Sequence, residues 1–155
     1  MALIDANAPS APRGFLPALL WLLTAAFAAR VAGLAIQSVW PQTFLPSFAA
    51  VQGSRLPYPV LLATQIAILA TMIRFTARIH AGTLIPSRQA ARILGLLGGL
   101  YLAVAIGRIV IGLVVPQAPP WFSTWIPALL HVALASWVLL VAGYHSSGAA
   151  RAEHE

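Results

Sequence analysis

The chain has 155 residues, of which 60% are hydrophobic and 8% are charged, whereas about 25% of the residues of a soluble domain are charged. Its net charge of +6 comes from nine arginines, no lysine and three acidic residues. Cysteine is absent, which excludes disulfides, thiol redox chemistry, thiolate metal sites and iron–sulfur clusters. The composition is that of an integral membrane protein. Nucleic-acid binding is not expected, because most of the arginines lie at the ends of apolar stretches.

Four apolar stretches follow one another, each long enough to cross a hydrocarbon layer of about 30 Å at about 1.5 Å per residue. Within a membrane domain at 14–145, we expect helical spans at residues 15–39, 58–75, 93–115 and 125–144. Residues 1–13 and 146–155 are expected to be a disordered leader and tail. A signal peptide is disfavoured, because the first apolar run is much longer than an h-region of about 7–15 residues. The fold class predicted is an all-α integral membrane protein with a four-helix transmembrane bundle.

The connections between the spans indicate the orientation of the chain. The first connection, residues 41–57, contains Phe44, Leu45 and Phe48, so we expect it to lie in the membrane interface. The first and third connections together contain a single arginine, Arg55. The leader, the middle connection and the tail share the other side, with six arginines in or next to them: Arg13, Arg74, Arg78, Arg88, Arg92 and Arg151. The positive-inside rule therefore predicts cytoplasmic N and C termini. The arginine-only, alanine-rich composition favours a bacterial inner membrane, with the protein multi-pass.

The third span carries an arginine on a face of small residues. On a helical wheel this face collects Gly98, Tyr101, Ala105, Arg108 and Gly112. Because small residues allow helices to approach closely, Arg108 is expected to face neighbouring helices rather than lipid. Gly95 and Gly99 have small-xxx-small spacing, which is typical of helix packing rather than of a nucleotide site.

Each span contributes one polar residue at a similar depth. Counted from the helix ends at about 1.5 Å per residue, these residues lie roughly 9–15 Å below the outer interface: Arg30, Gln65, Arg108 and His131. No span contains a carboxylate to neutralise the arginines. If both arginines face inward, their charge would have to meet backbone carbonyls, water, Gln65, Tyr101 or a bound anion. We call Arg30, Gln65, Tyr101, Arg108 and His131 the polar layer and treat them as candidate ligand-binding residues.

Each member of the polar layer also has a plainer interpretation. Arg30 and Arg108 could extend their side chains along lipid to reach the outer headgroups. Gln65 could serve only as an interhelical hydrogen-bonding residue, and His131 as a packed core histidine. No other span holds a histidine that could be a second axial haem ligand, so neither a metal site nor a particular cofactor is predicted.

The sequence contains no usable catalytic motif, and catalytic residues are therefore not assigned. It lacks a glycine-rich phosphate loop, a nucleophile elbow and a zinc-binding HExxH pattern, and no Asp or Glu lies within a span to pump protons. The favoured hypothesis is a non-catalytic membrane protein whose polar layer binds a lipophilic anionic or carbonyl ligand, a lipid or a quinone. The alternatives are an accessory subunit of a larger membrane complex or homo-oligomer, and an enzyme or transporter that uses His131.

One segment has a family resemblance. The run GGLYLAVAIGRIVIGL, residues 98–113, resembles the small four-helix bacterial membrane proteins of the DoxX-like type. The resemblance implies a four-helix membrane fold. The first hairpin departs from that pattern, so no residue role is transferred and the chain is assigned to no family.

Overall fold

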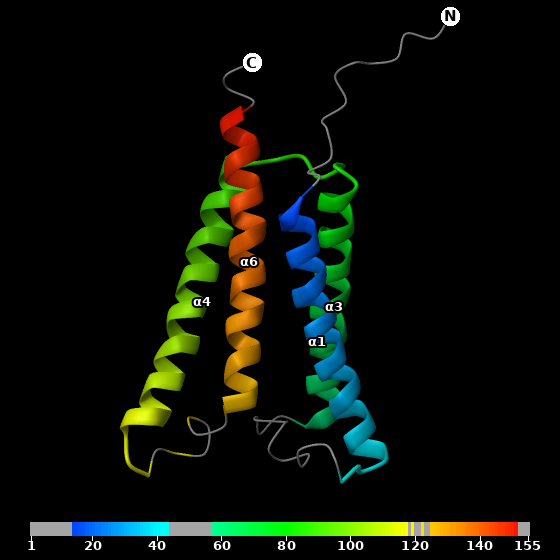
Figure 1. Ribbon diagram of the computed structural model, residues 1–155, viewed down its shortest axis with the longest axis vertical. Helices are drawn as coiled ribbons and strands as arrows, with labels where there is room; N and C mark the ends of the chain where they lie inside the picture. Colours follow the sequence, from blue (N-terminus) through cyan, green and yellow to red (C-terminus); the bar gives the residue numbers. More distant parts are fainter. Residues whose placement is uncertain (1–13, 44–56, 118, 120–121, 123–124, 152–155) are drawn as a thin grey trace, which may run out of the picture.

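The computed structural model describes residues 14–43, 57–117, 119, 122 and 125–151. Its long helices are α1 (Phe15–Val39), α3 (Tyr58–His80), α4 (Arg88–Val114) and α6 (Trp125–Arg151), and the described residues include no strand (Figure 1). All four are long and apolar enough to cross a membrane by length and composition, which confirms the predicted all-helical architecture. The expected leader at 1–13 and the interfacial residues Phe44, Leu45 and Phe48 lie outside the described residues.

Three helices extend beyond the apolar stretches from which their spans were predicted. Helix α3 continues to His80, and α4 already begins at Arg88, where the Ser87 hydroxyl accepts a hydrogen bond from the backbone of Ala90. Helix α6 continues to Arg151, so residues 146–151 are helical and not part of a disordered tail. Hydropathy marks where a helix leaves an apolar medium, whereas backbone hydrogen bonding continues until a cap or breaker ends it.

A glycine ends α3 and turns the chain toward α4. Gly82 has a φ of 67°, a left-handed conformation that glycine adopts without steric cost. The backbone N–H of Gly82 donates to the carbonyl of Ile79 at 3.1 Å, and that of Thr83 donates to Arg78 at 2.9 Å. This pair of bonds is the Schellman motif, which satisfies carbonyls at the end of a helix.

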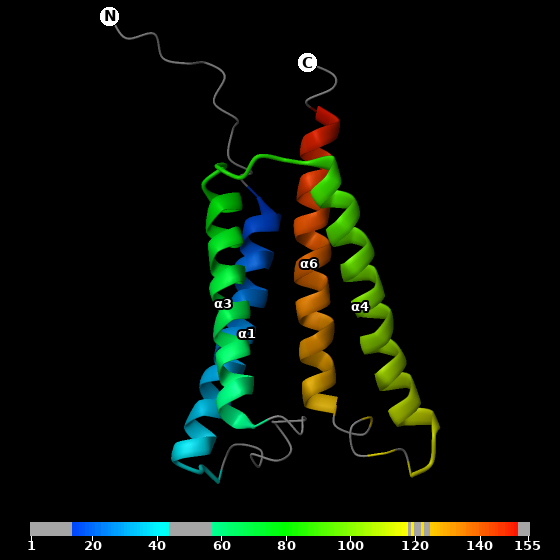
Figure 2. The same cartoon turned by 180° about the vertical axis from the view of Figure 1, so that it is seen from behind.

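The helices are arranged as two antiparallel hairpins, α1–α3 and α4–α6, which meet mainly along α1 and α6. Helix α6 lies between α4 and the α1–α3 pair, as both ribbon views show (Figures 1 and 2). Among the described residues α4 makes no extensive contact with α1 or α3, so the array is open rather than a closed bundle. The start of α1, the 81–87 connection and the end of α6 share one end of the array, which we call the terminal end; the opposite end is the distal end.

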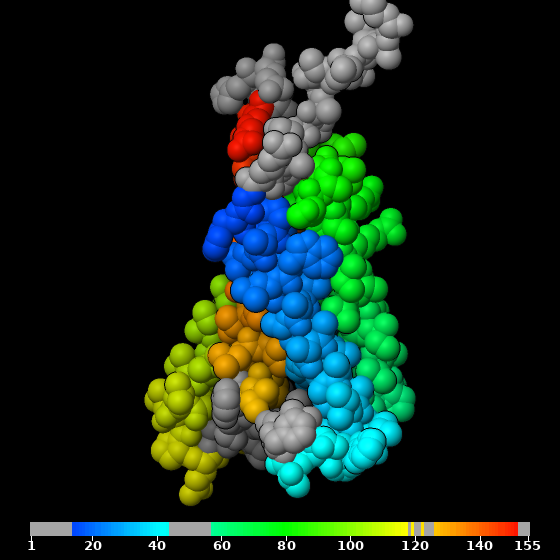
Figure 3. Space-filling model, turned by 45° about the vertical axis from the view of Figure 1, so that its right-hand side comes forward, coloured from blue at the N-terminus to red at the C-terminus, as the bar shows by residue number. Residues whose placement is uncertain are grey.

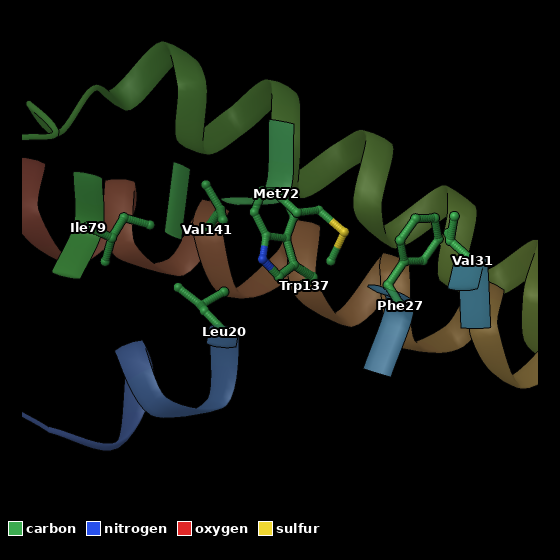
Figure 4. Close-up of a cluster of buried hydrophobic side chains, with 7 residues drawn as sticks. All are labelled: Leu20, Phe27, Val31, Met72, Ile79, Trp137 and Val141. Carbon is green, nitrogen blue, oxygen red and sulfur yellow. The ribbon is translucent and has the colours of Figure 1, made fainter. Parts of the chain in front are cut away.

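The main core lies where α1, α3 and α6 meet (Figure 4). It consists of seven buried side chains: Leu20, Phe27, Val31, Met72, Ile79, Trp137 and Val141. A small polar contact crosses this core, because the Trp137 indole N–H donates to the Thr76 hydroxyl at 3.2 Å and the hydroxyls of Thr24 and Thr76 are 3.5 Å apart. These bonds satisfy polar groups that would be costly to bury alone, and they link the two hairpins.

The 81–87 connection is docked on the end of α6. The Tyr144 hydroxyl donates to the carbonyl of Leu84 at 2.6 Å, and the Ser87 N–H donates to His145 Nδ1 at 3.1 Å. A Cβ placed on Gly148 would overlap the ring of Pro86, so this glycine allows the connection to lie directly against the helix. Tyr144 therefore helps to fix the terminal end.

The sides of the array expose large apolar side chains. Figure 3 shows one of these sides, with α1 at the front and α3 to its right. Along α4, Leu96 is 76% exposed and Leu100 is 66% exposed, and α1 and α3 add Leu22, Ile36 and Ile66. A surface this apolar is typical of helices that face lipid, because a soluble protein rarely exposes such a large apolar patch.

Candidate ligand-binding layer

The hydrogen bonds in the core define how the helices are aligned. Thr24, Thr76 and Trp137 lie at one level because their side chains are in contact. Helices α1 and α6 run antiparallel. Arg30 lies six residues beyond Thr24 on α1, and His131 lies six residues before Trp137 on α6, so Arg30 and His131 are at the same level. The charge of Arg30 acts on His131, in agreement with this alignment. The structure thus brings these two members of the polar layer together.

Tyr101 of α4 and His131 of α6 form the centre of the layer. The Tyr101 hydroxyl lies 2.5 Å from His131 Nδ1, and the ring centroids are 5.7 Å apart at 72°, an edge-on contact. In a neutral imidazole whose Nδ1 accepts from this hydroxyl, Nε2 carries the proton and remains a donor. Gly98, one turn before Tyr101, allows the close approach, since a Cβ there would lie 3.0 Å from carbons of both Val138 and Leu139.

Arg108 lies on the face of α4 that packs against α6. Its side chain is 3% exposed, and the other buried residues of α4 are Gly98 and Ala105. The prediction that Arg108 faces neighbouring helices is confirmed, and the alternative in which it runs along lipid does not fit this burial. Its positive charge acts on both Tyr101 and His131. In a medium of low dielectric such a charge acts more strongly than at a water-exposed surface.

Arg30 reaches the layer from the other hairpin. It is half-buried on α1, and its charge acts on Tyr58 at the start of α3 as well as on His131. Sequence reasoning missed Tyr58, which was treated only as the beginning of a span. Its spacing of seven residues from Gln65 was the available signal, because residues seven apart share a helix face.

Gln65 is buried on α3 with an unsatisfied oxygen. The residue is 6% exposed, and Oε1 has no hydrogen-bond partner among the residues that the structure describes. Interhelical hydrogen bonding through Oε1, the plainer interpretation of Gln65, is not seen within the described part of the chain. Gln37 is different, because its Oε1 accepts from the backbone N–H of Gln42 at 2.9 Å and helps to close the end of α1.

Gly95 and Gly99, the small-xxx-small pair of α4, do not take part in the close packing on α6. Space is open around Gly95 and Gly99, with no atom of the described residues within 4 Å of an added Cβ. The glycine that permits packing on α6 is Gly98, and the pair Gly95 and Gly99 lies on a face away from it. A pattern of small residues identifies a face on which a close helix could fit, but not which neighbour uses it.

The layer is positive and rich in hydrogen-bond donors. In the described part of the chain no group of three or more His, Cys, Asp or Glu side chains could hold a metal ion. The chain's acidic side chains are Asp5, Glu153 and Glu155, all outside the residues that the structure describes. Two guanidinium groups and an imidazole N–H can bind an anion or a carbonyl oxygen.

Comparison of the chain with known proteins finds no matching family model, no matching curated sequence and no matching solved structure. The resemblance of residues 98–113 to DoxX-like proteins therefore gains no support from a family match. The functional argument depends on the geometry of the polar layer.

Proposed function

We propose that the protein is a multi-pass membrane protein, with both termini in the cytoplasm, whose polar layer binds a lipophilic anionic or carbonyl ligand. A lipid or a quinone has the required chemistry. One observation carries the proposal: Arg108 is buried on the face of α4 that bears Tyr101, Tyr101 bonds to His131, and Arg30 of the other hairpin lies level with that pair. The sequence places no carboxylate between Asp5 and Glu153 to balance that charge.

Membrane insertion is supported by the exposed apolar sides of the helices. The orientation is supported by charge, since the arginines in or beside the 81–87 connection and at the end of α6 are exposed at the terminal end. Under the positive-inside rule this end is cytoplasmic, so the polar layer lies in the outer half of the membrane. The composition favours a bacterial inner membrane.

An arginine within a membrane is expensive, at about 2.5–3.5 kcal/mol on insertion scales. Such residues are usually tied to function, because a hydrophobic residue of similar size would insert more easily. Here the two charges would be offset by the ligand, and the Nε2–H of His131 adds a neutral donor. The arrangement binds and orients a ligand, and it needs no covalent chemistry.

The test is native mass spectrometry of the purified protein, wild type beside the Arg30→Leu/Arg108→Leu double variant. We expect a lipophilic molecule to remain bound to the wild type and to be lost from the variant. Arg74→Leu, an exposed arginine outside the layer, is the matched control and should retain the ligand. Insertion of the Arg30→Leu single variant should be unchanged or better, because the insertion penalty is removed. Equal retention by wild type and double variant would refute the proposed function.

A second candidate function is that of a subunit in a larger membrane complex or homo-oligomer. The observation that favours it is the open face of α4, where Gly95 and Gly99 leave room for a close helix and Leu96 is exposed. Co-purification of a partner at fixed stoichiometry in mild detergent, lost on Gly99→Leu substitution, would support this function. A bare monomer for both forms would count against it.

A further inference from the structure

The most informative polar atom outside the Tyr101–His131 pair is Oε1 of Gln65. It is enclosed by protein, and among the described residues it accepts no hydrogen bond. Most buried polar atoms in proteins have a partner, so an unsatisfied one calls for an explanation. Leucine or methionine would fill the same volume without the cost of burying an amide.

The position of Gln65 relates it to the arginines. Thr76 of α3 and Trp137 of α6 lie at one level, because they are hydrogen-bonded. Gln65 lies eleven residues from Thr76 along α3, whereas His131 lies six residues from Trp137 along α6. At about 1.5 Å per residue, Gln65 is about 7 Å closer to the distal end than His131. The charge of Arg30 reaches both His131 and Tyr58, which lies on the same face of α3 as Gln65. A headgroup that contacts Arg30 and extends about 7 Å toward the distal end therefore reaches the level of Gln65.

We propose that the ligand is an anionic lipid whose headgroup also carries a hydroxyl, with the anion between Arg30 and Arg108 and the hydroxyl donating to Gln65 Oε1. This inference rests on the proposed function and specifies its ligand. The arginines select a full negative charge over the neutral carbonyl of a quinone, because a buried cation and a half-buried one are best offset by an anion. Gln65 Oε1 supplies an unsatisfied acceptor beside the donors of the layer.

The donor on the headgroup is a hydroxyl rather than an ammonium. An ammonium would bring a further positive charge close to Arg30 and Arg108, which repel it, and would leave the headgroup without net charge. Gln65 lies closer to the distal end than His131, and the proposed orientation makes that end the outer one. This order agrees with a lipid of the outer leaflet, in which the headgroup hydroxyl lies farther out than the phosphate.

The experiment compares two lipids that differ in one hydroxyl. Delipidated protein in detergent is incubated with phosphatidylglycerol, phosphatidylmethanol or phosphatidylcholine with identical acyl chains, and bound lipid is measured by native mass spectrometry. The wild type should retain phosphatidylglycerol over phosphatidylmethanol by roughly three- to tenfold, which is the effect of one hydrogen bond. It should also retain both anionic lipids over phosphatidylcholine. Gln65→Leu should lose the preference for phosphatidylglycerol over phosphatidylmethanol and keep the preference for anionic lipids over phosphatidylcholine. Gln65→Met provides a second apolar variant of similar volume.

Gln37→Leu is the matched control, because Gln37 is also buried but its amide already bonds to Gln42. That variant should keep the preference for phosphatidylglycerol. Equal retention of phosphatidylglycerol and phosphatidylmethanol, with both lost from the Arg30→Leu/Arg108→Leu variant, would overturn this inference and leave the proposed function standing. No preference for either anionic lipid over phosphatidylcholine would count against anion binding at the layer altogether. Complete displacement of the lipid by equimolar soluble glycerol phosphate would overturn the assignment to a lipid.

Discussion

Two adjacent glycines in α4 provide a sharp test of how the second hairpin packs. A Cβ on Gly98 would lie 3.0 Å from carbons of Val138 and Leu139, whereas a Cβ on Gly99 would meet nothing within 4 Å. The substitutions Gly98→Leu and Gly99→Leu add the same atoms at neighbouring positions of one helix. Any difference between them therefore comes from the environment and not from the residue introduced.

The expected magnitudes follow from these distances. Both substitutions gain the helix propensity that glycine lacks, about 0.5–1 kcal/mol. At Gly98 this gain is opposed by overpacking, which costs typically about 1–3 kcal/mol when the neighbours must shift. The cost should lie toward the upper end, because a Cβ alone is already tight and the leucine adds further carbons in the direction of α6. Gly98→Leu should thus be less stable than Gly99→Leu by about 1–3 kcal/mol.

Reversible unfolding in detergent, followed by circular dichroism, measures this difference. A second readout is the Tyr101–His131 hydrogen bond, which should lengthen when α4 is pushed away from α6 and which the nitrogen chemical shifts of the imidazole report. Equal stability of the two variants, together with unchanged histidine shifts, would refute the α4–α6 packing described above.

Two further predictions concern the polar contact in the core and the docked connection. Trp137→Phe should lower the free energy of unfolding by about 0.5–1.5 kcal/mol, because it removes the hydrogen bond to Thr76. Thr76→Val removes the same hydrogen bond, so the losses of the two single variants should not add in the double variant. Additive losses in this double-mutant cycle would contradict the prediction. Gly148→Val should displace Pro86 and make the 81–87 connection more sensitive to limited proteolysis, whereas Gly143→Val, with open space around its Cβ, should not; equal cleavage of both variants would argue against docking.

The sequence was sufficient to predict the helices but not how they pair. Long apolar runs must be helical in a membrane, so the element type and the bounds of α1 follow from hydropathy alone. The ends of α3 and α6 did not follow, because Gly82 ends α3 through backbone hydrogen bonds and the 81–87 connection docks on α6, both in segments that hydropathy leaves out. The open position of α4 was also hidden, since lipid and protein are equally apolar neighbours for a leucine.

The polar layer was partly predictable for a similar reason. Helical periodicity placed Arg108 with Gly98 and Ala105, and all three are buried on one face. The hydrogen bond between Tyr101 and His131 could not be derived, because it depends on the register of α4 against α6, which the sequence pattern does not fix. Depths counted from helix ends also give only the level of the Cα atom, and a long side chain such as that of arginine carries its polar group several ångströms from that level.

The polar layer lies across the boundary between the two hairpins, and this has a thermodynamic consequence. Arg30 belongs to α1, whereas Arg108 and the Tyr101–His131 pair belong to α4 and α6. Two like charges brought toward one another oppose association of the hairpins, while the Thr76–Trp137 bond and the apolar core favour it. A bound anion would replace that repulsion by attraction on both sides. Because a ligand stabilises the state that binds it, occupancy of the layer would hold the hairpins together, and ligand binding and assembly would be linked through the α1–α6 contact.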